Sequence, residues 1–389
     1  GILLSVVVAF SVGALVQFLS RLIYSFNFEK RPNYINALFG GFAITAITYF
    51  IIIKGMKGTP FYVDVKHLIE YNTLLIITGS FLLWTLISQL LITFFNINIL
   101  KLIIGIGTFS LAMAFSGNDL VNFVGVPIAA WNSYQVWETS GISATTFSMG
   151  VLAQKVPSNV FLLLFAGAIM VVTLWTSSKA RNVIKTGIDL SRQGEGHEKF
   201  KPNPLSRLVV RASMGINLGN SYIIPAKTIA FVDSKFQKPV IELPKDKTYE
   251  LPAFDMVRAS VNLIVAGILI SIATSMRLPL STTYVTFMVA MGTSLADRAW
   301  GRESAVYRVA GVINVIGGWF LTAITAFLAA GLVAYLISWD MVMIPILLVL
   351  VAFLIGRNTV MHRKKSKEVK KQEYIQRADL ITIIGVIEE

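Results

Sequence analysis

The run ILKLIIGIGTFSLAMAFS, residues 99–116, carries one charged residue near its start and continues directly into GNDLVN, residues 117–122. The run approaches the length of about 20 apolar residues that a helix needs to cross the hydrocarbon core of a bilayer. Asp119 therefore lies beside sequence of membrane-spanning character, where an ionisable group is costly and indicates a functional site. The alternative is an Asp at the membrane surface that caps a helix.

The composition places the whole chain in the same class. Of 389 residues, 55% are hydrophobic and 14% are charged, whereas a soluble chain carries about 25% charged residues. We therefore predict an all-α, multi-pass membrane protein that contacts the lipid bilayer directly. The predicted spans are 1–24, 35–53, 73–95, 99–116, 157–176, 254–275, 309–337 and 339–360.

Two further apolar segments, 119–137 and 278–296, contain clustered polar residues, and we predict that they form broken or re-entrant helices. Gly117, Asn118 and Asp119 are poor helix formers. A helix that ends at such residues frees backbone carbonyls to face a cavity. An oxygen-rich break of this kind suits a small hard cation or a hydrated polar solute.

The distribution of charge predicts the orientation and the parts of the chain. The net charge of +13 does not indicate a nucleic-acid partner, because the basic residues gather beside membrane spans, where orientation rules put them. Lys179, Arg181 and Lys185 directly follow a span and predict that 177–253 is a cytoplasmic loop. The expected parts, in the cell (inner) membrane, are a bundle over 1–176, this loop, a bundle over 254–360 and a basic cytoplasmic tail over 361–389.

A second polar cluster lies in LPLSTTY, residues 278–284. Pro is favoured at the first position of a helix, so Ser281, Thr282 and Thr283 are expected in the first turn after Pro279. The N–H groups of that turn lack intrahelical partners and carry the positive end of the helix dipole, which with three hydroxyls would form a cradle for an oxyanion. Alternatively, the hydroxyls bond to carbonyls one turn earlier, as is common in membrane helices.

The two polar clusters complement each other. One offers donors for a tetrahedral anion, and the other offers a carboxylate and amide oxygens for a cation. An anion that enters a cell against the membrane potential needs cations with it, because each charge costs about 2.3 kcal/mol per 100 mV. Together the clusters predict cation-coupled uptake of an oxyanion.

At these two segments the chain resembles the inorganic phosphate transporter family, whose members carry Gly-Ala-Asn-Asp-x-x-Asn and Pro-x-Ser-Thr-Thr signatures in each of two inverted repeats. Residues 117–122 look like the first signature and residues 279–283 like the second. The resemblance implies an inverted-repeat transporter with broken helices that takes up inorganic phosphate with sodium or protons. It assigns the substrate site to Asn118, Asp119, Asn122, Ser281, Thr282 and Thr283, and the coupling-cation site to Gly117, Asn118 and Asp119.

The chain departs from the family pattern in three ways. Ser116 and Gly117 stand where the family usually has Gly and Ala, and Tyr284 stands where many members have His, which favours sodium over protons. One copy of each signature is present, so the chain resembles the second repeat and the end of the first. We expect an amino-terminal portion before Gly1 that carries the other half-site. The alternatives are a symporter of another oxyanion, such as sulfate or arsenate, and a non-transporting subunit or receptor.

Three other features enter the sequence prediction. Asp255 and Arg258 are spaced at i and i+3 and are expected to pair with each other, within the membrane or at its surface. Asp297 is expected in a solvated loop. The chain has no cysteine, and its sequence shows no nucleophile–base pair or metal cluster, so we expect neither an enzyme nor a cofactor beyond the coupling cation. Formation of a homo-oligomer is left open.

Overall fold

The fold was obtained as a computed structural model, which describes residues 2–26, 31–53, 67, 69–153, 159–193, 200–237, 254–278, 280–300, 304–361 and 364. Within these ranges the regular structure is helical and contains no strand. This confirms the all-α prediction. The chain forms two compact units, residues 1–312 and 313–389.

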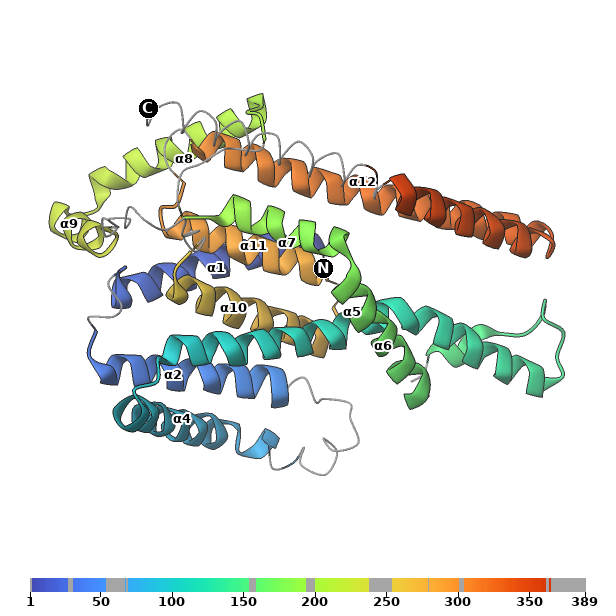
Figure 1. Cartoon of the computed structure of the whole chain (residues 1–389), viewed down its shortest axis with the longest axis horizontal. Coiled ribbons are helices and arrows are strands. Elements are labelled where there is room, and N and C mark those ends of the chain that lie inside the picture. The colour runs from blue at the N-terminus through green and yellow to red at the C-terminus, as the bar shows by residue number, and fades with distance from the viewer. Residues whose placement is uncertain are drawn as a thin grey trace, which may run out of the picture. The chain divides into compact units, whose positions relative to one another are not determined.

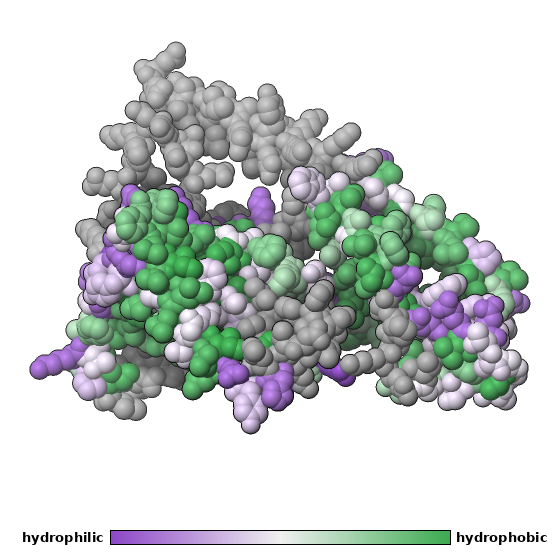
Figure 2. Space-filling view, turned by 90° about the horizontal axis from the view of Figure 1, so that it is seen from below, coloured by the Kyte–Doolittle hydropathy of each residue, from purple (hydrophilic) through white to green (hydrophobic). Residues whose placement is uncertain are grey.

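Long apolar helices confirm the prediction of a multi-pass membrane protein. In α4, Thr73–Phe95, the side chains of Leu74, Leu75 and Phe94 are 79%, 72% and 74% exposed. Such apolar exposure is expected where a helix faces lipid, and Figure 2 shows hydrophobic side chains over large areas of one face. Within the described ranges, the helices long and apolar enough to span are Ile2–Tyr24 (α1), α4, Ile99–Ser140 (α5), Met256–Ser275 (α10), Ser304–Trp339 (α12) and Met343–Met361.

Helix α5 corrects the prediction of a break at Asp119. It is one continuous helix of 42 residues that joins the predicted segments 99–116 and 119–137, and it contains Pro127. Each weak helix former costs about 1 kcal/mol or less, whereas an unsatisfied backbone group within a membrane costs several kcal/mol. Continuous backbone hydrogen bonding therefore outweighs the poor propensity of Gly117, Asn118 and Asp119.

Helix α11, Thr282–Ala296, occupies most of the second polar segment. With 15 residues it is about 22 Å long, which is less than the hydrocarbon thickness of about 30 Å. Ser281 precedes the helix as its N-cap residue, while Thr282 and Thr283 open its first turn, close to the predicted start. Pro279 lies outside the described residues.

Helices α1, α5, α10 and α11 of the first unit lie side by side with roughly aligned axes (Figure 1). Neighbouring pairs are α4 with α2 (Asn33–Ile47), α2 with α5, α5 with α10, and α1 with both α10 and α11. Helices α1 and α11 approach closely at Gly292, where an added Cβ would lie 2.1 Å from the carbonyl oxygen of Phe10. Small residues at such crossings allow membrane helices to pack backbone against backbone.

The remaining segments include several shorter helices. A π-helical turn, Thr48–Ile53, extends α2, and a 3₁₀ turn, Met149–Ala153, precedes the apolar helix α6, Val160–Thr176. The predicted loop 177–253 contains α7 (Ser178–Ser191), α8 (Pro204–Ile223) and α9 (Ala226–Lys235) where it is described. Helix α7 packs against α11, so this segment contributes to the first unit.

Candidate functional site

The fold brings the two predicted polar clusters into direct contact. The hydroxyl of Thr282 donates to both carboxylate oxygens of Asp119, with Oγ1–Oδ1 and Oγ1–Oδ2 distances of 2.9 and 3.0 Å. The two residues are 163 positions apart and come from α5 and from the first turn of α11. Thr282 is buried at 3% exposure, whereas Asp119 is half-buried. A carboxylate in a membrane helix is thus bonded to the N-terminal turn of a second helix.

The other predicted site residues differ in their exposure and in whether they contact Asp119. Asn118 is half-buried and donates from Nδ2 to Asp119 Oδ1 over 3.1 Å. Asn122 and Thr283 are exposed, as is Gly117, and Ser281 is half-buried. Among the described residues, none of these four donates a hydrogen bond to Asp119. The structure therefore joins Asn118, Asp119 and Thr282 directly and places the other four on adjacent turns of the same two helices.

The local electrostatics suit a negative group near the start of α11. The first-turn N–H groups of a helix lack intrahelical acceptors and carry about half a positive charge, which stabilises a nearby carboxylate. A carboxylate offers about four lone-pair sites, and Asp119 uses some of them for Thr282 and Asn118. Because Asp119 is half-buried, it retains oxygen sites for a hard cation, which prefers oxygen ligands.

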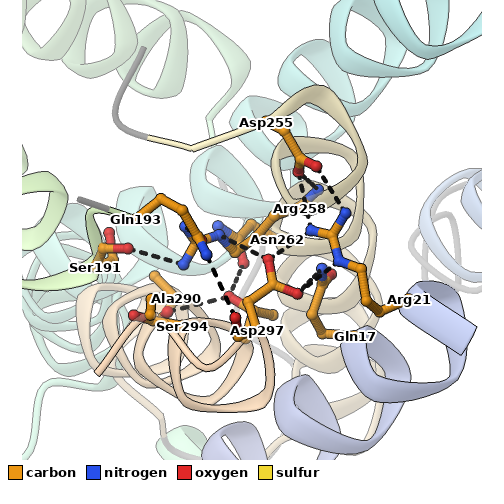
Figure 3. Close-up of polar contacts among 12 residues, drawn as sticks. Gln17, Arg21, Ser191, Gln193, Asp255, Arg258, Asn262, Ala290, Ser294 and Asp297 are labelled. Atoms are coloured by element: carbon orange, nitrogen blue, oxygen red, sulfur yellow. Dashed lines mark hydrogen bonds and ion pairs between the residues drawn. The ribbon is translucent and has the colours of Figure 1, made fainter. Parts of the chain in front are cut away.

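The opposite end of α11 holds a buried ion cluster, consisting of Arg21, Asp255, Arg258 and Asp297 (Figure 3). Asp297 is the C-cap residue of α11 and is 1% exposed. Arg21 of α1 binds it through two nitrogens, Nε–Oδ1 at 2.9 Å and Nη2–Oδ2 at 2.6 Å. Arg21 Nη1 also lies 2.7 Å from Asp255 Oδ2. Gln17, one turn before Arg21, donates to Asp297 Oδ1 over 2.8 Å.

The cluster corrects two sequence predictions. Asp255 and Arg258 do not pair through their side chains: Asp255 is the N-cap of α10 and accepts from the main-chain nitrogen of Arg258 at 3.0 Å, because a cap carboxylate turns toward the first-turn N–H groups. The side chain of Arg258 instead contacts Asp297, with an Nε–Oδ2 distance of 3.4 Å. Asp297 is not in a solvated loop. It is buried inside the fold and neutralised by Arg21, which lies 276 positions away in the sequence.

Residues 191–193, which comprise the last residue of α7 and the two residues after it, are hydrogen-bonded to the ion cluster. Arg258 Nη1 donates to the carbonyl of Ser191 over 2.9 Å, and Nη2 donates to Gln193 Oε1. Gln193 in turn donates from Nε2 to the carbonyl of Asp297 over 3.3 Å. Arg308, at the start of α12, donates to the carbonyl of Arg192 over 2.9 Å. These contacts could not be predicted from the sequence, in which the only indication is the presence of Arg residues beside membrane spans.

A polar contact lies on α11 between the two sites. Thr293 donates to Asn262 Oδ1 over 2.6 Å and joins α11 to α10. Asn262 is one turn after Arg258, so α10 continues the polar side of the ion cluster toward the middle of the helix.

A scan against protein-family models and searches of curated proteins and of solved structures found no match to this chain. The function is therefore argued from the sequence pattern and the site geometry.

Proposed function

We propose that the protein is a secondary active transporter of the cell (inner) membrane that takes up inorganic phosphate together with a cation. The observation that carries this proposal is the bond from Thr282 to Asp119, which joins two segments that resemble the signatures of the inorganic phosphate transporter family. The two segments are far apart in the sequence. A shared solute site gives a physical reason for their contact.

Asp119 is assigned to the coupling cation. An oxyanion placed beside its carboxylate would be repelled by about 4 kcal/mol for unit charges 4 Å apart at an effective dielectric constant of 20. A cation between the two removes this repulsion and makes anion binding depend on the cation. Asn118 and Thr282 already contact the carboxylate and supply further oxygens. Gly117 and Asn122 lie within one turn of Asp119 and complete the proposed α5 side of the site.

The first turn of α11 is assigned to phosphate. Ser281 and Thr283 flank Thr282 and place hydroxyls beside first-turn N–H groups, an arrangement suited to a tetrahedral oxyanion. Anionic substrates are held in this way by half-helix N-termini in other transporters. The seven site residues contain no Arg or Lys, so dipoles and the co-bound cation would hold the anion and allow its release. We propose sodium as the cation, since Tyr284 follows the hydroxyl triplet and offers no group that titrates near neutral pH.

Uptake of labelled phosphate into vesicles that contain the protein tests the proposal. We expect saturable uptake that requires an inward sodium gradient and is unaffected by an equal concentration of sulfate. Inhibition by sulfate would indicate a general oxyanion symporter. Absence of saturable uptake under both sodium and proton gradients would overturn the transport proposal and favour a receptor or subunit role.

A further inference from the structure

We infer that the ion cluster and residues 191–193 form a gate at the end of α11 remote from Asp119, which opens for solute release. This inference rests on the proposed function, because it concerns how the same transport site reaches the cytoplasm. The two ends of α11 have different partners. Thr282 at one end contacts Asp119, and Asp297 at the other end belongs to the ion cluster. The two sites are therefore about 22 Å apart along one rigid helix.

The energetics of the ion cluster favour a functional role over a purely stabilising one. The side chains of Arg21, Arg258 and Asp297 are all 0% exposed. The cost of removing such charges from water largely offsets their mutual attraction, so apolar residues of similar size would serve stability equally well. Ionisable groups within membrane proteins generally mark pathways and moving parts.

The contacts of Gln193 and Ser191 give the gate a part that can move. Residues 191–193 are attached to the bundle by hydrogen bonds from Arg258 and Arg308, and by the bond from Gln193 to the carbonyl of Asp297. These contacts are hydrogen bonds between polar groups, which can exchange for bonds to water when residues 191–193 move. Arg258 and Asp297 take part both in the ion cluster and in the contacts with residues 191–193. A shift of α11 on solute binding would therefore loosen residues 191–193.

The orientation of the gate follows from the sequence. Lys179, Arg181 and Lys185 place the segment that contains α7 on the cytoplasmic side. Residues 191–193 end the described part of that segment before residue 200. The gate then closes the cytoplasmic end of the route along α11, with the Asn262–Thr293 contact between it and Asp119.

Single-cysteine labelling tests the gate without measuring transport. The chain has no cysteine, so Ser191→Cys would provide one reactive thiol at a position that is 1% exposed. A membrane-impermeant maleimide would be applied to inside-out vesicles. Gln193→Ala removes two of the hydrogen bonds and should raise the labelling rate about tenfold, the effect of losing roughly 1.4 kcal/mol. Ser234→Cys, exposed on α9, is the control and should label equally fast in both backgrounds.

Ligand dependence separates a gate from a fixed clamp. With Gln193 intact, adding sodium and phosphate should change the labelling rate of Ser191→Cys and leave that of Ser234→Cys unchanged. If Ser191→Cys labels as fast as Ser234→Cys, or if sodium and phosphate do not change its rate, the gate is refuted, and an effect of Gln193→Ala alone indicates a fixed clamp. Should Ser191→Cys fail to fold, Gly187→Cys reports the same movement, because its Cβ would lie 3.8 Å from Phe287 of α11.

The failures of the two proposals are distinguishable. A loss of phosphate uptake in wild-type vesicles refutes phosphate transport and leaves the effect of Gln193→Ala on labelling to be measured. Unchanged labelling with normal sodium-driven phosphate uptake refutes the gate alone.

Discussion

The two ends of α11 differ in how completely their carboxylates are satisfied. Asp297 is 1% exposed and is held by Gln17, Arg21 and Arg258. Asp119 is half-buried and accepts from Thr282 and Asn118, two neutral donors. A buried carboxylate with cationic partners has little capacity left for a solute, whereas a half-buried one with neutral partners can still bind a cation. We therefore propose that Asp119 binds the solute and that Asp297 couples α11 mechanically to residues 191–193.

The largest effect on stability is expected when Asp297, at the buried end of α11, loses its negative charge. Asp297→Asn leaves Arg258 buried without its carboxylate and weakens the hold on Arg21, so unfolding should become easier by about 3–5 kcal/mol. The measurement is the thermal denaturation midpoint in detergent.

Asp233→Asn is the matched control for this loss of charge. Asp233 pairs with Arg298 at 2.7 Å, but both side chains are about half exposed, at 52% and 51%. An exposed pair contributes roughly 0–1 kcal/mol, so the control should denature close to the wild type. Equal midpoints for Asp297→Asn and Asp233→Asn would contradict the buried pairing.

Sequence reasoning predicted the two ends of α11 with unequal success. The cluster after Pro279 and the segment around Asp119 were recognisable because local polarity stood out against apolar runs. Asp297 was not recognisable, since its partner Arg21 is 276 positions away and only the fold brings them together. Local pattern identifies residues that are unusual where they stand, and it does not identify the distant partner that makes a charge buried.

The helices also differ in how well the sequence predicts them. Helix α4, Thr73–Phe95, has the bounds that its apolar run predicts. Helix α5 continues through Gly117–Asp119, where propensity predicts a break, because backbone hydrogen bonding dominates within a membrane. The inverted repeat stays a prediction, as does the re-entrant character of residues 278–296.

The second prediction concerns the end of α11 that contacts Asp119, where a substitution removes one hydrogen-bond donor and keeps the side-chain shape. Thr282→Val removes the hydroxyl that donates to Asp119 and retains the side-chain volume. A hydrogen bond to a charged group is worth about 1.5–3 kcal/mol, so the sodium concentration for half-maximal uptake should rise about tenfold to a hundredfold.

Thr286→Val is the control for Thr282→Val. Thr286 lies one turn further along α11 and bonds to the carbonyl of Thr282 within the same helix. Its sodium dependence should match the wild type in uptake assays at fixed phosphate. A similar shift in both variants would mean that the effect comes from altered helix packing and would remove the special role of Thr282.

The smallest expected effect concerns the continuity of α5. Gly117 is exposed, and an added Cβ would meet nothing within 4 Å. Gly117→Ala should therefore stabilise the helix by about 0.5–1 kcal/mol, seen as a slightly raised denaturation midpoint. Alanine keeps the main chain through which Gly117 belongs to the proposed cation site, so the maximal uptake rate should be unchanged if α5 stays continuous during transport. A large fall in uptake with a raised midpoint would indicate that the helix must unwind at Gly117.

The central claim is that Asp119 binds the coupling cation, and sodium-driven phosphate uptake by Asp119→Asn tests it most directly. Asparagine keeps the size and can still accept from Thr282, but it removes the negative charge that attracts sodium. The account predicts background uptake from a variant that still folds and inserts into the membrane. Uptake with wild-type sodium dependence would contradict it and make Asp119 a structural residue.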